Sequence, residues 1–408
     1  MGADASPAHV DLASIRAAAR LLAGVARRTP LAHSRALTEL IGGRVELKCE
    51  NLQRTGSFKL RGAYTRMHGL TGEQRAAGVV AASAGNHAQG VALAAHLLGL
   101  RATVFMPVGA ALPKVAATRD YGADVQLVGA ALEDTLAAAR EFAERTGAVL
   151  IHPFDHHAVL AGQGTVGLEI GEQLPEVRTV LVPTGGGGLA AGVAAALAEL
   201  VPAARVVAVQ AAEMAAWPES LAAGRPVRAP ARPTIADGIA VAEPGRAPFQ
   251  VLSALVDDVV TVSDDALSRA LLHCLERAKL VVEPAGAAGV AALLEAPDRF
   301  EPPVVCVLSG GNIDPLLLLH VIQHGMAAAG RYLAVRVRLA DRPGALAELL
   351  TLVGKLGCNV LDVEHTRVSG ALALGEVDVA LNAETRGPEH RTEVLDALRA
   401  SGLRVELR

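Results

Sequence analysis

The chain has 408 residues, a formal net charge of −4 and a hydrophobic content of 51%, with only 2% aromatic residues. This length suits two or three domains. The absence of a basic block argues against a nucleic-acid partner, and the longest apolar runs are too short or too interrupted by glycine to span a bilayer. Met1–Ala8 lacks a charged segment followed by an apolar core, so no signal peptide is predicted. Four widely spaced cysteines without a C-x-x-C pair predict reduced thiols in a cytoplasmic protein.

Up to about residue 325, helical patterns alternate with short apolar runs. Leu12, Ile15 and Leu22 recur at helical spacing, which predicts a helix over 11–27 capped by Asp11 or Ser14. Strands are expected at 45–49, 79–82, 102–106, 125–128, 149–152, 179–182, 205–209 and 304–308, with helices near 59–68, 86–99, 113–121, 132–145, 159–173, 189–200 and 263–277. This alternation predicts an α/β fold with parallel sheets covered on both faces. Residues 211–262 are rich in Pro, Gly and Ala, and their structure is less certain.

The pattern changes after a linker at residues 326–331. Apolar and polar residues alternate from Tyr332, which predicts a half-exposed strand. A helix opened by Asp341-Arg342-Pro343-Gly344 follows, then strands near 360–368 and 375–382, a helix at 389–400 and a final strand at 403–407. This βαββαβ order predicts a ferredoxin-like domain over residues 332–408.

The segment Glu50–Ala63 contains Lys59 between Phe58 and Leu60, in a chain with five lysines and 33 arginines. A lysine amine can be deprotonated in a dry setting and can condense with an aldehyde, whereas an arginine cannot. The alternative is an exposed lysine near the start of a helix capped by Thr55 or Ser57.

Glu50–Ala63 resembles the Schiff-base lysine motif of the threonine and serine dehydratases. Further segments resemble this family in the expected order, namely Ser83–Gly90, Gly185–Gly188, Ala236–Ala240, Val281–Ala287 and Ser309–Asn312. The resemblance implies two open parallel-sheet α/β domains of the tryptophan synthase β-like fold and a pyridoxal 5′-phosphate cofactor. It places the catalytic region at 1–325, with a smaller subdomain at roughly 54–153, and the C-terminal unit resembles the ACT regulatory domain.

The same resemblance assigns the cofactor contacts. Lys59 supplies the amine that forms the imine and later removes the Cα proton. Gly185, Gly186, Gly187, Gly188 and Leu189 would hold the phosphate, because a glycine run between a strand and a helix lets backbone N–H groups converge on an anion. Asn86 would contact the phenolic oxygen O3′, and Ser309 the pyridine nitrogen.

Other residues near these motifs complete the expected site. The turn Ser83-Ala84-Gly85-Asn86-His87 would bind the substrate carboxylate at a helix N-terminus, with a structural role expected for His87. Without the other motifs, each of these turns has an ordinary capping or turn role as its alternative. Glu283 lies either near the cofactor or at a helix start. No divalent metal site is predicted, because Glu213 is the only acidic residue near positions 210–216.

The resemblance implies a threonine ammonia-lyase that forms 2-oxobutanoate and ammonia from L-threonine, with L-serine as a slower substrate. A serine-specific dehydratase, a racemase-like enzyme and a catalytically inactive amino-acid sensor are the alternatives. Racemisation should be minor, because Ala84 stands where serine racemases of this fold carry a serine. The ACT-like domain implies control by a branched-chain amino acid, as in isoleucine biosynthesis, bound at Asp341, Arg342, Pro343 and Gly344, or dimerisation without a ligand. A homodimer or homotetramer is expected.

Overall fold

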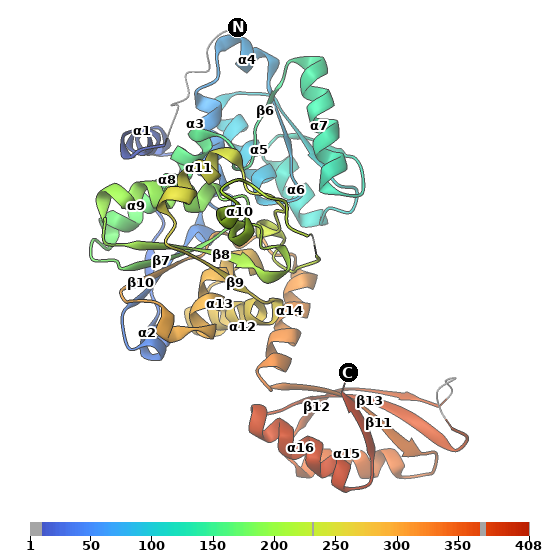
Figure 1. Cartoon of the computed structure of the whole chain (residues 1–408). Coiled ribbons are helices and arrows are strands. Elements are labelled where there is room, and N and C mark those ends of the chain that lie inside the picture. The colour runs from blue at the N-terminus through green and yellow to red at the C-terminus, as the bar shows by residue number, and fades with distance from the viewer. Residues whose placement is uncertain (1–9, 231, 368–372, 408) are drawn as a thin grey trace. The chain divides into compact units, whose positions relative to one another are not determined.

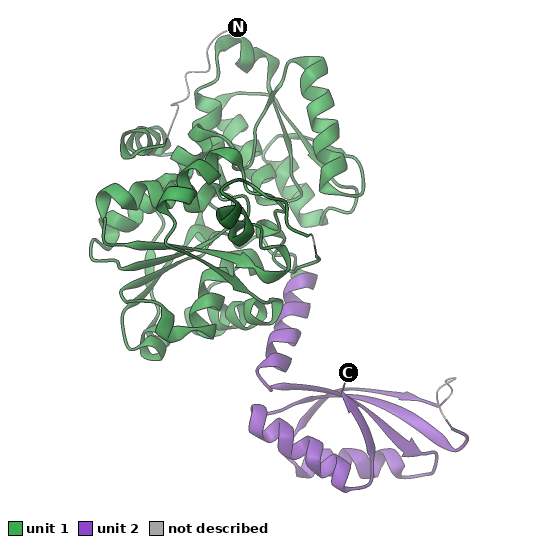
Figure 2. Ribbon diagram, in the orientation of Figure 1, with its two compact units in different colours: residues 1–315 green, residues 316–408 purple. Residues whose placement is uncertain are grey.

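The computed structural model describes residues 10–230, 232–367 and 373–407. The chain divides into two compact units, residues 1–315 and 316–408 (Figure 2). The sequence prediction for Met1–Ala8 and the predicted strand end at Val368 lie outside the described residues. The predicted linker at 326–331 overlaps the end of a helix, Pro315–Ala328, whose first residue closes the first unit.

The larger sheet of the first unit has six strands in the order β1-β2-β10-β7-β8-β9 (Figure 1). Its strands are β1 (Leu31–His33), β2 (Val45–Lys48), β7 (Thr179–Pro183), β8 (Arg205–Ala211), β9 (Asp258–Val262) and β10 (Val304–Val307). All neighbours run parallel except β1, which pairs antiparallel with β2 at one edge.

A second sheet of four parallel strands is built from the intervening part of the chain. Its order is β5-β4-β3-β6, with β3 (Val79–Ala82), β4 (Ala102–Met106), β5 (Asp124–Leu127) and β6 (Val149–Leu150). The two parallel sheets confirm the predicted two-sheet α/β fold. The order of strands along the chain would also allow the strands at 179–182, 205–209 and 304–308 to continue the sheet formed by residues 79–150. That interpretation is wrong, because those three strands belong to the six-stranded sheet.

Helices connect the strands and cover the sheets (Figure 1). In the described part of the first unit they are α1 (Leu12–Leu22), α2 (Arg35–Ile41), α3 (Lys59–His68), α4 (Gly72–Ala77), α5 (Asn86–Leu98), α6 (Leu112–Asp120), α7 (Leu132–Thr146), α8 (His157–Gln173), α9 (Gly188–Leu200), α10 (Trp217–Ala223), α11 (Arg246–Leu255), α12 (Asp264–His273) and α13 (Ala288–Glu295); α14 (Pro315–Ala328) follows. Short helical turns lie at η1 (Glu50–Leu52), η2 (Ala212–Met214), η3 (Asp237–Ile239), η4 (Cys274–Ala278), η5 (Pro284–Ala287) and η6 (Pro297–Arg299). The expected cap is present, since Asp11 accepts a hydrogen bond from the backbone of Ser14 at 2.8 Å.

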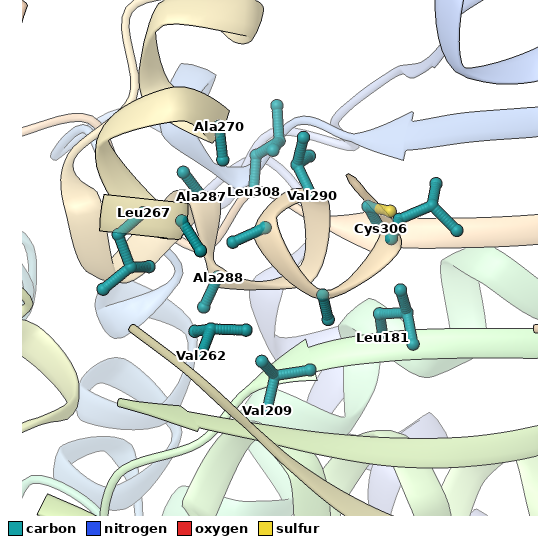
Figure 3. Close-up of a cluster of buried hydrophobic side chains, with 14 of the residues drawn as sticks. Leu181, Val209, Val262, Leu267, Ala270, Ala287, Ala288, Val290, Cys306 and Leu308 are labelled. Atoms are coloured by element: carbon teal, nitrogen blue, oxygen red, sulfur yellow. The ribbon is translucent and has the colours of Figure 1, made fainter. Parts of the chain in front are cut away.

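The strands of the larger sheet are apolar on both faces because helices cover both. Leu181 of β7 belongs to the core cluster with α12 and α13, whereas its neighbours Val180 and Val182 belong to the cluster with α8, α9 and α11. Figure 3 shows Ala288 of α13 in one cluster with Val262 of β9 and Val209 of β8. Burial on both faces explains the continuous apolar runs in the sequence. The helices packed on the two faces also hold the carboxyl ends of the strands in place.

The second unit has the predicted βαββαβ order. It contains β11 (Tyr332–Ala340), α15 (Ala345–Lys355), β12 (Asn359–Thr366), β13 (Glu376–Glu384), α16 (Pro388–Ala400) and β14 (Arg404–Leu407), in the antiparallel sheet order β12-β13-β11-β14. Leu333, Val335, Val337 and Leu339 of β11 are buried in its core, as the alternation predicted. Among the described residues of both units, no helix is long and apolar enough to cross a membrane.

Candidate active site

A cavity of about 340 Å³ lies where the carboxyl ends of strands from both parallel sheets meet. Such an edge is the usual ligand site of open parallel sheets, because loops and helix N-termini converge there. The cavity brings together the residues singled out in the first unit from the sequence, which are Lys59, Ser83, Ala84, Gly85, Asn86, His87, Gly185, Gly186, Gly187, Gly188, Leu189, Glu283 and Ser309.

Lys59 is the first residue of α3, and its side chain faces this cavity. Its Nζ donates to the backbone carbonyl of Pro153 at 3.1 Å and lies 5.0 Å from the centre of the Phe58 ring. Burial lowers the pKa of Lys59 to about 8, and the Glu283 carboxylate opposes this only in part. The helix cap is Phe58 and no side chain caps it, so the interpretation of Lys59 as an exposed residue of a capped helix start is wrong.

The turn Ser83–His87 joins β3 to α5, with Gly85 at the helix N-cap. The Asn86 amide nitrogen donates to Glu283 Oε1 at 2.6 Å, and its oxygen accepts from Asn312 at 2.8 Å. One N–H of Asn86 therefore remains for a ligand. His87 is buried with its Nε2 2.7 Å from the Ile151 carbonyl, and burial lowers its pKa to about 3. This environment suits the structural role expected for His87.

The glycines 185–188 form the turn between β7 and α9. A Cβ on Gly186 would lie 2.4 Å from the ring of Phe154, and one on Gly187 would lie 2.3 Å from Trp217. Gly187 also has φ +97°, which an L side chain adopts only with strain. The indole N–H of Trp217 donates to the Gly185 carbonyl at 2.8 Å, and this hydrogen bond stabilises the turn. The turn thus presents bare backbone to the cavity at the start of α9.

Glu283 and Ser309 approach from the larger sheet. Ser309 follows β10 and is buried, and its carbonyl accepts from Phe58 N at 3.2 Å. Burial raises the pKa of Glu283 to about 7, and the nearby Asp237 carboxylate adds to this effect. Glu283 makes no side-chain cap on η5. Of the two roles left open for Glu283, the structure favours the one within the site.

Some cavity residues were not predicted from the sequence, among them Phe154, Lys114 and Asp237. Lys114 on α6 and Asp237 on η3 form an ion pair of 2.9 Å. Asp237 lies in the segment 236–240, which was noted only for its resemblance to the dehydratases. Lys114 lies in the helix predicted near 113–121, to which no function was assigned. The five-lysine count was a usable signal for Lys114, because this chain otherwise places arginine where it needs positive charge.

The predicted effector residues lie together in the second unit. Asp341, Arg342, Pro343 and Gly344 form the turn from β11 to α15 and line a cavity of about 460 Å³. The polar side chains of His365 and Arg367 line the same cavity, and so do apolar residues that include Leu346, Leu350 and Val377.

Both units of the chain match known protein families. Residues 22–310 match the family described as pyridoxal-phosphate dependent enzyme. The chain belongs to this family. Residues 334–400 match the ACT domain, so the enzyme carries an ACT domain after its family domain. Both matches confirm the resemblances seen in the sequence.

Several relatives of this pyridoxal-phosphate dependent enzyme match it over most of its length. An L-threonine ammonia-lyase of Thermotoga maritima is 46% identical over 98% of this chain and 99% of its own length. A crystal structure described as a T.th. threonine deaminase superposes with a TM-score of 0.71 at 43% identity, covering 74% of this chain and 99% of its own. The structure of maize serine racemase gives a TM-score of 0.73 at 38% identity, covering 76% and 96%.

The residues present suit pyridoxal phosphate. The turn 185–188 opens a helix of 13 residues, and a Cβ on any of its four glycines would lie 3.0 Å or less from a neighbouring protein atom. Glycine is therefore required at each position, and the bare backbone N–H groups at the start of the helix form a cradle that suits a phosphate. Lys59 offers an amine of lowered pKa in the same cavity. Asn86 keeps a free N–H, and Ser309 adds a neutral hydroxyl. Together these groups supply the four kinds of contact that the cofactor needs.

Proposed function

We propose that this enzyme is a threonine ammonia-lyase, which eliminates water from L-threonine and yields 2-oxobutanoate and ammonia. The observation that carries the proposal is the single cavity that gathers Lys59, the asparagine turn, the glycine cradle and Ser309. The names of the Thermotoga maritima relative and of the T.th. threonine deaminase support the same reaction.

Bound pyridoxal phosphate would hold the substrate amine covalently and withdraw electrons from its α-carbon. Lys59 would take the Cα proton. A pKa of about 8 leaves part of the amine uncharged near neutral pH, as a base requires. The Pro153 carbonyl, 3.1 Å from Nζ, gives the amine a fixed position between proton transfers.

Backbone and neutral groups would hold the anions and the ring. The N–H groups at the start of α5 would receive the substrate carboxylate, and those at the start of α9 the phosphate. Ser309 would contact the ring nitrogen with a hydroxyl. A neutral hydroxyl does not hold that nitrogen protonated as a carboxylate would, which favours loss of the β-hydroxyl over transamination. The enamine released after loss of water would tautomerise to an imine, which a water molecule hydrolyses to the keto acid and ammonia.

A serine racemase-like reaction is the second candidate, because the maize serine racemase has a similar fold at 38% identity. Ala84 lines the cavity and offers no hydroxyl to return a proton to the opposite face of the α-carbon. We therefore expect elimination from L-serine, giving pyruvate, with little D-serine. Chiral chromatography of the products checks this, and abundant D-serine would contradict it.

The deciding experiment measures 2-oxobutanoate formed from L-threonine and pyruvate formed from L-serine by the holoenzyme. Lys59→Ala should abolish both reactions. Lys355→Ala, an exposed lysine of α15, is the matched control and should leave both unchanged. A colourless protein that fails to turn over either amino acid after cofactor is supplied would overturn the proposal.

Residues 332–408 would act as the regulatory domain, with 326–331 as the linker to the catalytic region 1–325. A branched-chain amino acid would bind at Asp341–Gly344. The cavity there holds the ion pair of Asp341 and Arg367, at 3.6 Å, for the charged groups of an amino acid, and apolar Leu346 and Leu350 for an aliphatic side chain. Threonine turnover with and without isoleucine and valine tests this. An unchanged rate, together with no binding of either amino acid by calorimetry, would contradict it.

A homodimer or homotetramer and a cytoplasmic location complete the proposal. ACT-like domains commonly pair through strands or helices, and light scattering would give the oligomeric state. Cys49, Cys274, Cys306 and Cys358 are all free thiols, as expected in a reducing compartment. Burial raises the pKa of Cys49 to about 11, so this thiol is a poor nucleophile.

A further inference from the structure

The ion pair between Lys114 and Asp237 lies at the mouth of the active-site cavity. Lys114 Nζ and Asp237 Oδ2 are 2.9 Å apart, and both residues line the cavity. The Lys114 side chain is 14% exposed and that of Asp237 is 58% exposed. The pair therefore faces the cavity on one side and solvent on the other, as a residue pair at an entrance would.

The two partners belong to different halves of the catalytic unit. Lys114 is on α6, between β4 and β5 of the four-stranded sheet. Asp237 is on η3, which packs against η5 in the half built on the six-stranded sheet. The Asn86–Glu283 hydrogen bond of 2.6 Å also joins these halves, but Glu283 is only 3% exposed, so that bond lies deeper.

Lys114 also lies beside the turn that would take the substrate carboxylate. Its Nζ is 3.6 Å from the position of a Cβ on Gly85. While Asp237 holds the ammonium, the positive charge is neutralised. When the pair opens, the same ammonium faces an anion that arrives at the N–H groups of the turn.

We propose that Lys114 and Asp237 form a clasp across the cavity mouth, which opens for ligand exchange and lets Lys114 guide the carboxylate of the incoming amino acid. The clasp itself follows from the geometry, whereas the identity of its anion rests on the proposed function. In this scheme Lys114 faces the carboxylate of the incoming amino acid, and Asp237 is a positioning residue that acts through Lys114.

A second ion pair provides a control. Arg228 and Glu133 are 3.5 Å apart with side chains 62% and 74% exposed. Glu133 is on α7, and neither residue lines the active-site cavity. Opening this pair should leave passage through the mouth unchanged.

The test measures how fast the uncharged nucleophile hydroxylamine releases cofactor from the holoenzyme, followed by the loss of the cofactor's visible absorbance. Asp237→Asn and Lys114→Met should each speed release about two- to fivefold, the range that a partly exposed ion pair supports. Glu133→Gln should match the wild type. Wild-type rates in both clasp variants would overturn the clasp.

The charge-swapped protein Lys114→Asp/Asp237→Lys keeps the proposal falsifiable if one single variant folds poorly. It should return the release rate toward that of the wild type, and a rate as high as in Asp237→Asn would overturn the pairing. Hydroxylamine release needs no turnover of threonine, so it separates a failed clasp from a failed function. For the guiding role, Lys114→Met should raise the KM for L-threonine more than it lowers kcat, and an unchanged KM would overturn that role.

Discussion

Replacing Arg61 with methionine should severely destabilise the catalytic unit and disturb the helix that carries Lys59. Arg61 lies on α3 two residues after Lys59 and is 1% exposed. Its guanidinium donates to Glu50 twice, both at 2.8 Å, to Glu169 at 2.7 Å, to Thr165 at 3.0 Å and to a backbone carbonyl at 3.0 Å. All five N–H donors are therefore used.

The expected cost follows from what Arg61→Met leaves behind. Glu50 is fully buried, and Lys48 is the next cation that lowers its pKa. Removing one partner of a buried pair costs about 3–5 kcal/mol, because the remaining charge has lost its compensation. The exposed Arg35–Glu39 pair, at 3.6 Å with side chains 82% and 65% exposed, is the control, and Arg35→Met should cost less than about 1 kcal/mol.

The assay is urea unfolding followed by the fluorescence of Trp217, the single tryptophan, which is buried in the catalytic unit. An unchanged urea dependence of the free energy is needed to compare variants. Burial alone would raise the pKa of Glu50, but Arg61 holds it below its usual range. The stability that this carboxylate contributes is therefore present above its ordinary pKa of 4.5 and lost as the pH falls. A loss below about 1 kcal/mol at pH 7 for Arg61→Met, the range of exposed pairs, would refute the reasoning.

Three further substitutions, one of them with a control outside the site, test other parts of the site. Gly187→Ala, whose Cβ would lie 2.3 Å from Trp217, should weaken cofactor binding at least about fivefold in an absorbance titration, since a strained backbone alone costs about 1–3 kcal/mol. Gly99→Ala, with φ +65° and no neighbour within 4 Å, should leave that affinity unchanged. The pKa of Glu283 is raised from 4.5 to about 7, so its ionisation costs stability as the pH rises through this range. Urea unfolding of the apo form should therefore show that Glu283→Gln gains stability relative to the wild type as the pH rises from about 4.5 to 7. Ala84→Ser should increase D-serine formation from L-serine in chiral chromatography, and an unchanged D-serine yield would contradict the role assigned to Ala84.

Local signals in the sequence were enough to predict most of the fold. The apolar run 79–82 is β3, and the alternation from Tyr332 is β11. A strand buried on both faces has a continuous apolar run, whereas a strand buried on one face alternates between apolar and polar residues. The strands β1 and β9 were missed. β1 has three residues, and β9 ends the segment rich in Pro, Gly and Ala, where strand patterns are weak.

The glycine turn and Lys59 could be located from the sequence because their chemistry sits in contiguous motifs. The contacts that tune them could not. Asn86 meets Glu283 across 197 positions of the chain, and Lys114 meets Asp237 across 123. Only the packing of two separate sheets brings these residues together. Arg61 shows the same limit, since its partner Glu50 is close in sequence but Glu169 is 108 positions away.

The electrostatics of the cavity explain why its anion sites are made of backbone. Burial lowers the pKa of Lys59 to about 8 and raises that of Glu283 to about 7, so both groups move toward their uncharged forms. Apart from the Lys114–Asp237 pair, whose charges offset each other, a cavity so tuned offers little fixed charge to a phosphate or a carboxylate. The N–H groups at the starts of α5 and α9 carry partial positive charge that no proton can remove. Anion binding at these two turns should therefore stay constant across the pH range in which Lys59 changes its protonation. The pKa of Lys59 can then be lowered without weakening the binding of the cofactor phosphate or the substrate carboxylate.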